Sequence, residues 1–255
     1  MMKISAAIIT YNEERNIQRC LESLQAVADE IVVVDSFSED RTKQICQNFD
    51  LTFIENPFEG HIQQKNFALD QTKYDMILSL DADEALSDKL KKSILEIKTQ
   101  PENENQAFSV NRLTNYCGKW IYHSGWYPDQ KVRLWNKKSG KWGGVNPHDK
   151  VVLFDNTTVR QLKGDLLHYS YYSIEEHIMQ INKFSSIAAN AMKDKQKALV
   201  LTKMLFSPLV RFLRDYIFKG GFRDGFYGFI ICRNSAYSRF LRYGKLYQLL
   251  VKNEK

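Results

Sequence analysis

Glycine, proline and cysteine are all scarce in this chain of 255 residues. Its 12 Gly and 5 Pro exclude a collagen-like or low-complexity protein. The four cysteines, Cys20, Cys46, Cys117 and Cys232, lie far apart, which excludes both the paired spacing of a zinc site and a dense disulfide framework. We therefore expect reduced, buried thiols in a cytosolic protein.

Long hydrophobic runs are also missing. No stretch approaches the roughly 18 uninterrupted apolar residues that a membrane-spanning helix needs. The apolar run near the N-terminus soon meets Glu13 and Glu14, so it is too short for a secretory signal. With 44% hydrophobic and 26% charged residues, the composition is that of a globular protein. The length predicts one large domain, or one domain with a C-terminal extension.

Charge is unevenly distributed along the chain. The net charge is +6, but residues 183–255 hold 15 basic against 4 acidic residues, a balance of +11. Residues 1–182 hold 21 basic against 26 acidic residues, a balance of −5. A mildly acidic body with a strongly basic tail indicates an anionic neighbour for the tail.

Apolar runs and helical repeats alternate over the first hundred residues. The runs at 3–9, 30–34, 51–54 and 75–80 have the composition of strands buried on both faces. Such an alternation predicts right-handed crossovers and a mainly parallel sheet with helices on both faces. Helices are expected over 13–25 with Asn12 as the cap, after Ser38, over about 63–72, and from about Ser87.

The rest of the chain has a different character. Residues 101–155 are rich in Trp, Tyr, Gly and Asn, which predicts short strands and long loops. Ser173 and Glu176 form the pattern of a capping box and predict a helix over 173–191. We expect a main domain over 1–182, with halves of about 1–100 and 101–182. A helical extension over 183–255 is expected to pack on it, with breaks at Pro208, Gly220–Gly221 and Gly225.

Polar clusters follow three of the predicted strands, at 10–12, 35–42 and 81–84. Ligands bind at the carboxyl ends of the strands in an open parallel sheet. Because residues i and i+2 of an extended chain point to the same side, Asp81 and Asp83 can face one point beyond the sheet edge. Two carboxylates suit Mg²⁺ or Mn²⁺. The alternative, solvated loop acids, is less favoured because a buried strand precedes the pair. Neither G-x-G-x-x-G nor a P-loop motif occurs.

Four motifs in the first 84 residues, AAIITYNEE, IVVVDSFSEDRT, QKNFAL and LSLDADE, resemble in order those of the family 2 inverting glycosyltransferases of the GT-A fold. The later segments WYPD (126–129), VRLW (132–135) and FRDG (222–225) are similar to a bacterial subgroup that includes lipopolysaccharide-core glucosyltransferases. The resemblance implies an α/β fold of the GT-A type, with a mainly parallel sheet flanked by helices. The C-terminal basic, aromatic-rich helices would be an extension of that fold.

The resemblance also implies substrates, a cofactor and roles for residues. The donor would be a nucleotide diphosphate sugar, the acceptor a saccharide or glycolipid, and the cofactor Mg²⁺ or Mn²⁺. Asp35 would accept a hydrogen bond from the base, Lys65 would neutralise the diphosphate, and Asp83 would bind the metal. The full set implied at the donor side is Thr10, Tyr11, Glu13, Asp35, Lys65, Asn66 and Asp81 for the nucleotide sugar, with Asp83 and His168 for the metal.

The motifs leave three candidates for the carboxylate that would act as catalytic base. Asp149 is our candidate, although relatives more often carry Glu there, and Asp129 and Glu84 are its rivals. His168, after an apolar pair, is the candidate late metal ligand, and the alternative is an ordinary core or edge histidine. Residues assigned to the acceptor side are Trp126, Asp129 and His148.

Dense aromatic and basic residues in the tail leave several interpretations open. Over 203–219 their pattern is typical of a helix lying on an anionic bilayer surface, which favours a peripheral place on the cytoplasmic face of the inner membrane. Ordinary core packing with a solvated basic rim is the alternative, and nucleic acid is not expected as a partner. The favoured function is an inverting hexosyltransferase of cell-envelope synthesis, and the alternative is a catalytically inactive sugar-nucleotide or glycan-binding scaffold.

Overall fold

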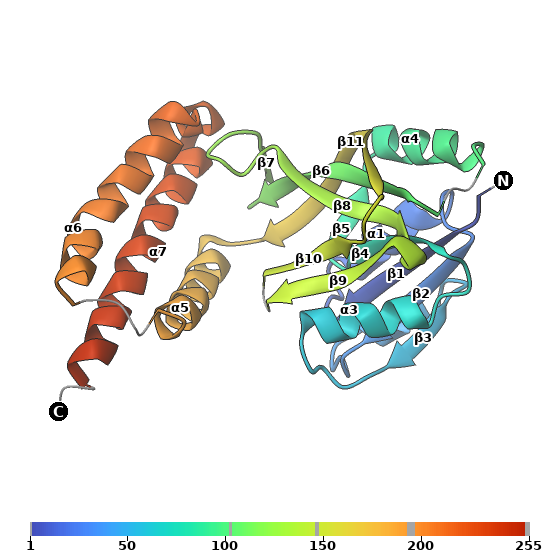
Figure 1. Cartoon of the computed structure of the whole chain (residues 1–255), viewed down its shortest axis with the longest axis horizontal. Coiled ribbons are helices and arrows are strands. Elements are labelled where there is room, and N and C mark those ends of the chain that lie inside the picture. Colours follow the sequence, from blue (N-terminus) through green and yellow to red (C-terminus); the bar gives the residue numbers. More distant parts are fainter. Residues whose placement is uncertain (1, 102–103, 146–147, 193–196, 253–255) are drawn as a thin grey trace. The chain divides into compact units, whose positions relative to one another are not determined.

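The computed structural model describes residues 2–101, 104–145, 148–192 and 197–252, and these form two compact units (Figure 1). Unit 1 comprises Met1–Leu113 and Asp129–Tyr169, and unit 2 comprises Thr114–Pro128 and Ser170–Lys255. The expected boundary after residue 182 therefore differs from the division in the structure, where residues 114–128 and 170–182 belong with the basic tail.

Unit 1 contains the predicted parallel strands, in the order β3-β2-β1-β4. Their apolar runs form strands because each is covered on both faces, and the pairs Thr10↔Asp35 and Ile9↔Asp81 align the polar strand ends at one edge. This confirms the mainly parallel sheet. The strands are β1 (Ile4–Thr10), β2 (Glu30–Asp35), β3 (Thr52–Glu55) and β4 (Met76–Asp81).

Helices cover both faces of these strands, as predicted. Apolar side chains of α1, α2 and α4 pack with one set of alternating strand residues, and those of α3 pack with the other set. Ser87 caps α4 by accepting a hydrogen bond from the Leu90 N–H, as its sequence indicated. The helices are α1 (Ile17–Leu24), α2 (Thr42–Cys46), α3 (His61–Asp70) and α4 (Asp88–Lys98).

The expected cap at Asn12 is wrong. Asn16 occupies the N-cap of α1, and Asn12 adopts a φ of 53° in the loop after β1. There the Asn12 side chain accepts a hydrogen bond from the Glu39 N–H at 2.8 Å. Asn tolerates the left-handed backbone region better than most residues. Asn12 can therefore hold the loop after β1 against the loop after β2.

Antiparallel strands extend the sheet in the order β4-β8-β6-β11-β5. The expectation of short strands over 101–155 is wrong for β6, which has 11 residues, and β11 beyond that stretch has 14. Only Ala82 and Asp83 separate β4 from β5, yet these strands lie at opposite ends of this run, so the sheet must curl. The added strands are β5 (Glu84–Leu86), β6 (Gln106–Tyr116), β7 (Lys119–Ile121), β8 (Asp129–Asn136) and β11 (Thr158–Tyr171), and a separate hairpin consists of β9 (Gly140–Val145) and β10 (His148–Leu153).

Unit 2 is helical, and α6 (Lys197–Leu213) and α7 (Gly225–Lys252) run side by side in it (Figure 1). The break expected at Pro208 is wrong, because α6 continues through that residue. The chain does turn at Gly220, whose φ is +65°, through a π-helical turn (Arg214–Phe218) and a 3₁₀ turn (Gly221–Asp224). No helix in the described ranges is both long and apolar enough to cross a membrane.

The third helix of unit 2 is α5 (Ile174–Asn190), and its cap at Ser173 is confirmed. Ser173 accepts a hydrogen bond from the Glu176 N–H at 3.1 Å. The buried stripe follows His177, Ile181, Ser185 and Ala189. Ile178 lies outside this stripe and is exposed.

Candidate active site

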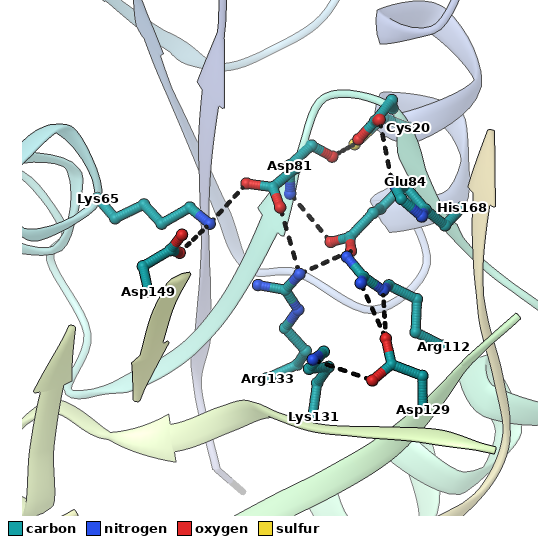
Figure 2. A network of polar contacts seen from close by, with 11 residues as sticks. Cys20, Lys65, Asp81, Glu84, Arg112, Asp129, Lys131, Arg133, Asp149 and His168 are labelled. Carbon is teal, nitrogen blue, oxygen red and sulfur yellow. Dashed lines mark hydrogen bonds and ion pairs between the residues drawn. The ribbon is translucent and has the colours of Figure 1, made fainter. Parts of the chain in front are cut away.

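Asp81 lies at the centre of a network of charges at the carboxyl end of β4 (Figure 2). Its carboxylate pairs with Lys65 Nζ at 2.9 Å and with an Arg133 nitrogen at 3.2 Å. Burial alone would raise the pKa of Asp81, but Lys65 and Arg133 outweigh it and hold that pKa well below the ordinary value. Asp81 is therefore a fixed anion at the edge of the sheet.

Glu84 and Arg133 form the buried base of this network. The Glu84 side chain has no exposed surface; it pairs with Arg133 at 2.6 Å and accepts a hydrogen bond from the Asp81 N–H. Arg112 lies 3.6 Å from the same carboxylate. Burial would lower the pKa of Arg133, but the two carboxylates outweigh it and raise that pKa. Motif assignment missed Arg112 and Arg133; a lone Arg in the apolar strand VRLW was the available signal for Arg133.

Lys65 joins two acids that lie far apart in the sequence. Its side chain, 5% exposed, pairs with Asp149 Oδ2 at 2.8 Å as well as with Asp81, and its ammonium lies 4.2 Å from the Trp142 ring centre. Asn66 exchanges two hydrogen bonds of 3.0 Å with the Trp142 backbone and so ties α3 to β9. The candidate base and the candidate phosphate ligand are thus direct partners.

Asp83 and His168 also meet, as the metal hypothesis requires. His168 Nε2 lies 3.1 Å from Asp83 Oδ2, and both side chains are partly exposed. Burial, and then the charge of Asp83, raise the pKa of Glu13 to about 7. The negative charge of Asp83 therefore acts on Glu13 as well as on His168, and a divalent cation bound to Asp83 would offset it.

The donors fit a hard divalent cation only in part. A carboxylate and an imidazole are both ligands of Mn²⁺, and the carboxylate also suits Mg²⁺. In the described residues, no group of three or more His, Cys, Asp or Glu side chains is placed to hold a metal ion. Asp83 and His168 would thus supply two ligands, and diphosphate oxygens and water would supply the others.

The strand ends of β1 and β2 hold the other expected donor residues. Thr10 is buried, and its hydroxyl has no hydrogen-bond partner within the described structure, whereas Tyr11 is 56% exposed. Asp35 is 1% exposed, and its two carboxylate oxygens accept hydrogen bonds from Ser38 at 2.7 and 2.5 Å. Asp35 therefore shapes the loop that follows β2, in addition to any contact with a ligand.

The three acceptor-side residues belong to different parts of the structure, with Asp129 in unit 1 and Trp126 in unit 2. Asp129 pairs with Arg112 at 2.8 Å and with Lys131 at 2.9 Å; burial would raise its pKa, but these cations lower it. Trp126 belongs to unit 2, where its ring packs on that of Tyr116. The backbone of His148 pairs with β9, and its side chain lies outside the described part of the structure.

Residues 5–156 match the family model described as Glycosyl transferase family 2. LpsC of Rhizobium meliloti, a lipopolysaccharide core biosynthesis glycosyltransferase, is 30% identical over 252 residues, or 97% of this chain and 93% of LpsC. An uncharacterized glycosyltransferase of Rickettsia prowazekii is 32% identical over 262 residues, or 100% of this chain and 90% of that protein. Staphylococcus aureus TarS 1–349 in complex with UDP aligns over 99% of this chain and 91% of that chain, at 16% identity and a TM-score of 0.46. Since the family model covers more than half of the sequence, the chain belongs to glycosyl transferase family 2 and is a glycosyltransferase.

Proposed function

We propose that the chain transfers a hexose from a nucleotide diphosphate sugar to a saccharide or glycolipid acceptor of lipopolysaccharide-type synthesis, with inversion at the anomeric carbon. The observation that carries the proposal is the Asp83–His168 pair, 3.1 Å apart, beside the fixed anion Asp81 at the ends of parallel strands. The relative named for lipopolysaccharide core biosynthesis, similar over nearly its whole length, supports the acceptor class.

The donor side would use a divalent metal held by Asp83 and His168. Bound there, Mg²⁺ or Mn²⁺ stabilises the charge of a leaving diphosphate. Thr10, Tyr11 and Glu13 lie along the loop after β1 and would border the nucleoside. Asp35 and Asn66 would hold the surrounding loops, as their hydrogen bonds to Ser38 and Trp142 indicate.

Asp149 is the favoured catalytic base because each of its rivals contacts two cations. Glu84 is fully buried against Arg133, and Asp129 pairs with two cations. Asp149 uses Oδ2 for Lys65, which leaves Oδ1 to accept the proton of an attacking acceptor hydroxyl. Its contact with Lys65 also keeps it next to the donor side.

A peripheral place on the cytoplasmic face of the inner membrane completes the proposal. It is supported by Leu205 and Leu209, which are 65% and 59% exposed on α6. Phe212, also on α6, stacks on Tyr216 and packs against Phe229. The bilayer-facing residues would therefore be the exposed apolar residues Leu205, Phe206, Leu209 and Val210, which we call the outer side of α6.

The test of the function is donor turnover by the purified chain with Mn²⁺, across a panel of nucleotide sugars. Asp83→Asn should abolish turnover, while Asp88→Asn, at a 91% exposed carboxylate on α4, should leave the rate unchanged. The anomeric configuration of the product, read by NMR, tests inversion. Tight donor binding without turnover for any acceptor would favour the inactive scaffold.

Asp149→Asn separates the candidate bases. Loss of a general base lowers the rate by roughly 10²- to 10⁴-fold. Donor affinity should stay nearly unchanged, because Lys65 keeps its contact with Asp81. A near-normal turnover number for Asp149→Asn would reject the assignment, and Asp129→Asn would be the next variant to measure.

A further inference from the structure

A pocket of about 330 Å³ lies in unit 2, on the surface of α6 and α7 and far along the chain from the residues of the candidate active site. Its polar lining consists mainly of cations. Lys203 and Arg211 come from α6, Arg214 from the π-helical turn and Arg239 from α7. We call these four residues and the space they line the arginine pocket.

Positive charge in the arginine pocket is only partly compensated. Asp215, whose side chain has no exposed surface, pairs with Arg211 and with Arg214, the latter at 2.9 Å. No carboxylate lines the pocket itself in the described part of the chain. Burial lowers the pKa of Arg211, and repulsion from Arg214 and Arg239 adds to this although Asp215 acts against it. Asp215 is one carboxylate beside the four cations of the arginine pocket, so the pocket carries net positive charge and favours a bound anion.

The geometry of the donors suits a phosphate. Arginine side chains present forked N–H groups that match phosphate oxygens, and three of them converge here from two helices and the turn that follows α6. The hydroxyl of Ser207, also in the lining, is buried and has no hydrogen-bond partner in the described structure. A phosphate oxygen would satisfy it.

Apolar side chains at the same pocket indicate what carries the phosphate. Phe206 and Val210 line it while remaining 62% and 63% exposed, and Leu205 and Leu209 adjoin them on α6 at 65% and 59%. A free phosphate, nucleotide or sugar phosphate would leave this apolar surface in water. An acyl chain attached to the phosphate would cover it.

We propose that the arginine pocket binds the phosphate of an anionic phospholipid, with Phe206, Val210, Leu205 and Leu209 lying among the acyl chains. The proposal rests on the membrane association given above and adds to it a specific headgroup site. It commits to a bilayer lipid as the ligand. It also predicts how the outer side of α6 is oriented, toward the hydrocarbon, with Arg214 and Arg239 at the level of the headgroups.

The experiment is flotation of the full chain with phosphatidylcholine vesicles containing phosphatidylglycerol. Arg214→Gln/Arg239→Gln should raise the Kd for these vesicles about tenfold or more. Lys183→Gln/Arg233→Gln is the matched control: it removes two exposed positive charges from the same unit outside the pocket lining, and should raise the Kd about twofold at most. An equal loss in both variants would mean that net charge alone attracts the membrane, and would overturn the pocket.

Two further arms separate the phosphate from other anions. Vesicles with oleate in place of phosphatidylglycerol, at matched surface potential, should bind clearly more weakly, and equal binding would overturn the proposal. Inorganic phosphate and glycerol 3-phosphate should give no saturable rise in Tm at millimolar concentration. A saturable rise that Arg214→Gln/Arg239→Gln abolishes, with no vesicle binding by the full chain, would replace the lipid by a soluble phosphate.

Donor turnover distinguishes failure of this proposal from failure of the proposed function. Turnover in solution should be unchanged in Arg214→Gln/Arg239→Gln, since both arginines lie outside the donor side. Conversely, Asp83→Asn should lose turnover and still float with the vesicles. Vesicle binding by a chain that never turns over any donor would refute the enzyme and leave the lipid site intact.

Discussion

At the scale of single residues, a buried charge is stable only while its partners stay in place. Arg133 is 3% exposed and holds two carboxylates, Glu84 and Asp81, at 2.6 and 3.2 Å. Its strand neighbours Val132, Leu134 and Trp135 form part of the apolar packing of unit 1. The Glu84–Arg133 pair at the base of the network is therefore enclosed by core and cannot be rehydrated without local unfolding.

Arg133→Met should destabilise the protein by about 3–5 kcal/mol, because Glu84 would stay buried without its cation. Urea unfolding measures the change. The double variant Arg133→Met/Glu84→Gln removes both charges and should recover part of the loss. Arg41→Met, at a 74% exposed arginine that pairs with Glu14, should cost about 1 kcal/mol at most. A loss for Arg133→Met no larger than that of Arg41→Met would contradict this account of the network.

His177 makes the stability of unit 2 depend on pH. Burial lowers its pKa to about 4, and Tyr116 and Asn234 contact its Nδ1 at 3.0 and 3.1 Å. Between pH 6.5 and about 4 the unfolded chain therefore binds a proton that the folded chain does not. Stability should fall as the pH falls, by about 1.4 kcal/mol per unit and about 3 kcal/mol in total, and be unaffected by His177 above pH 6.5.

Chemical unfolding of wild type and His177→Gln at pH 7 and pH 5 tests this expectation. Gln offers an acceptor to the same partners and cannot take up the proton, so the pH dependence of the variant should be smaller than that of wild type by about 2 kcal/mol. His61→Gln, at an exposed residue of α3, is the control and should keep the wild-type dependence. Identical slopes for wild type and His177→Gln would reject the role of this histidine.

At the scale of elements, two glycines of α7 have opposite surroundings. A Cβ at Gly228 would lie 2.0 Å from the Gly221 carbonyl oxygen, whereas a Cβ at Gly244 would meet only the Met204 sulfur, at 3.7 Å. Gly228 thus lets the helix pack directly against the backbone of the turn before it. Gly244 has no such constraint.

Gly228→Ala should therefore destabilise the protein by about 1–3 kcal/mol or more, since rigid backbone would have to move. Gly244→Ala should stabilise it by up to about 1 kcal/mol, because Ala is the better helix former. The change in Tm of each variant gives the sign. Stabilisation by both substitutions would mean that the contact between α7 and the turn is not close.

Elements with a strong local signal were the ones that the sequence predicted correctly. Buried strands such as β1 and β2 and capped helices such as α4 and α5 depend on periodicity and caps close in sequence. In contrast, β11 has two buried residues, Leu162 and Leu166, among exposed and half-buried ones, and its length is set by pairing with strands far along the chain. The break predicted at Pro208 is wrong because α6 continues through it. A proline removes one backbone hydrogen bond of a helix, and packing of the neighbouring residues can maintain the helix despite that loss.

The candidate site shows the same contrast between features with a local sequence signal and features set by distant contacts. Motif order predicted Asp81 and Asp83, and the apolar pair before His168 marked that residue as the late ligand; the structure brings Asp83 and His168 within 3.1 Å. The ion pair between Lys65 and Asp149 spans 84 residues and depends on how the β9–β10 hairpin packs on α3, which no local pattern encodes. Partners of buried charges are therefore the part of a site that sequence alone predicts least well.

At the scale of the whole molecule, the compact units do not follow the order of the chain. Residues 114–128 lie in the first half of the sequence, yet their buried side chains Tyr116 and Ile121 pack with Ile231 of α7. Asp224 also accepts hydrogen bonds from the backbone N–H groups of Tyr122 and His123. The basic tail is thus the partner of an internal segment, which a boundary at residue 182 would separate from it.

This division predicts that a fragment of residues 1–182 is poorly folded. Removing α7 would expose Tyr116 and Ile121, both fully buried, and would leave the Tyr122 and His123 N–H groups without Asp224. The fragment should bind a hydrophobic dye and tend to aggregate. Unit 1 alone, made by joining residues 1–113 to 129–169 through a short Gly-Ser linker, keeps its own core and should unfold cooperatively in urea. A cooperative 1–182 fragment with no dye binding, beside an unfolded unit 1, would instead favour the boundary at residue 182.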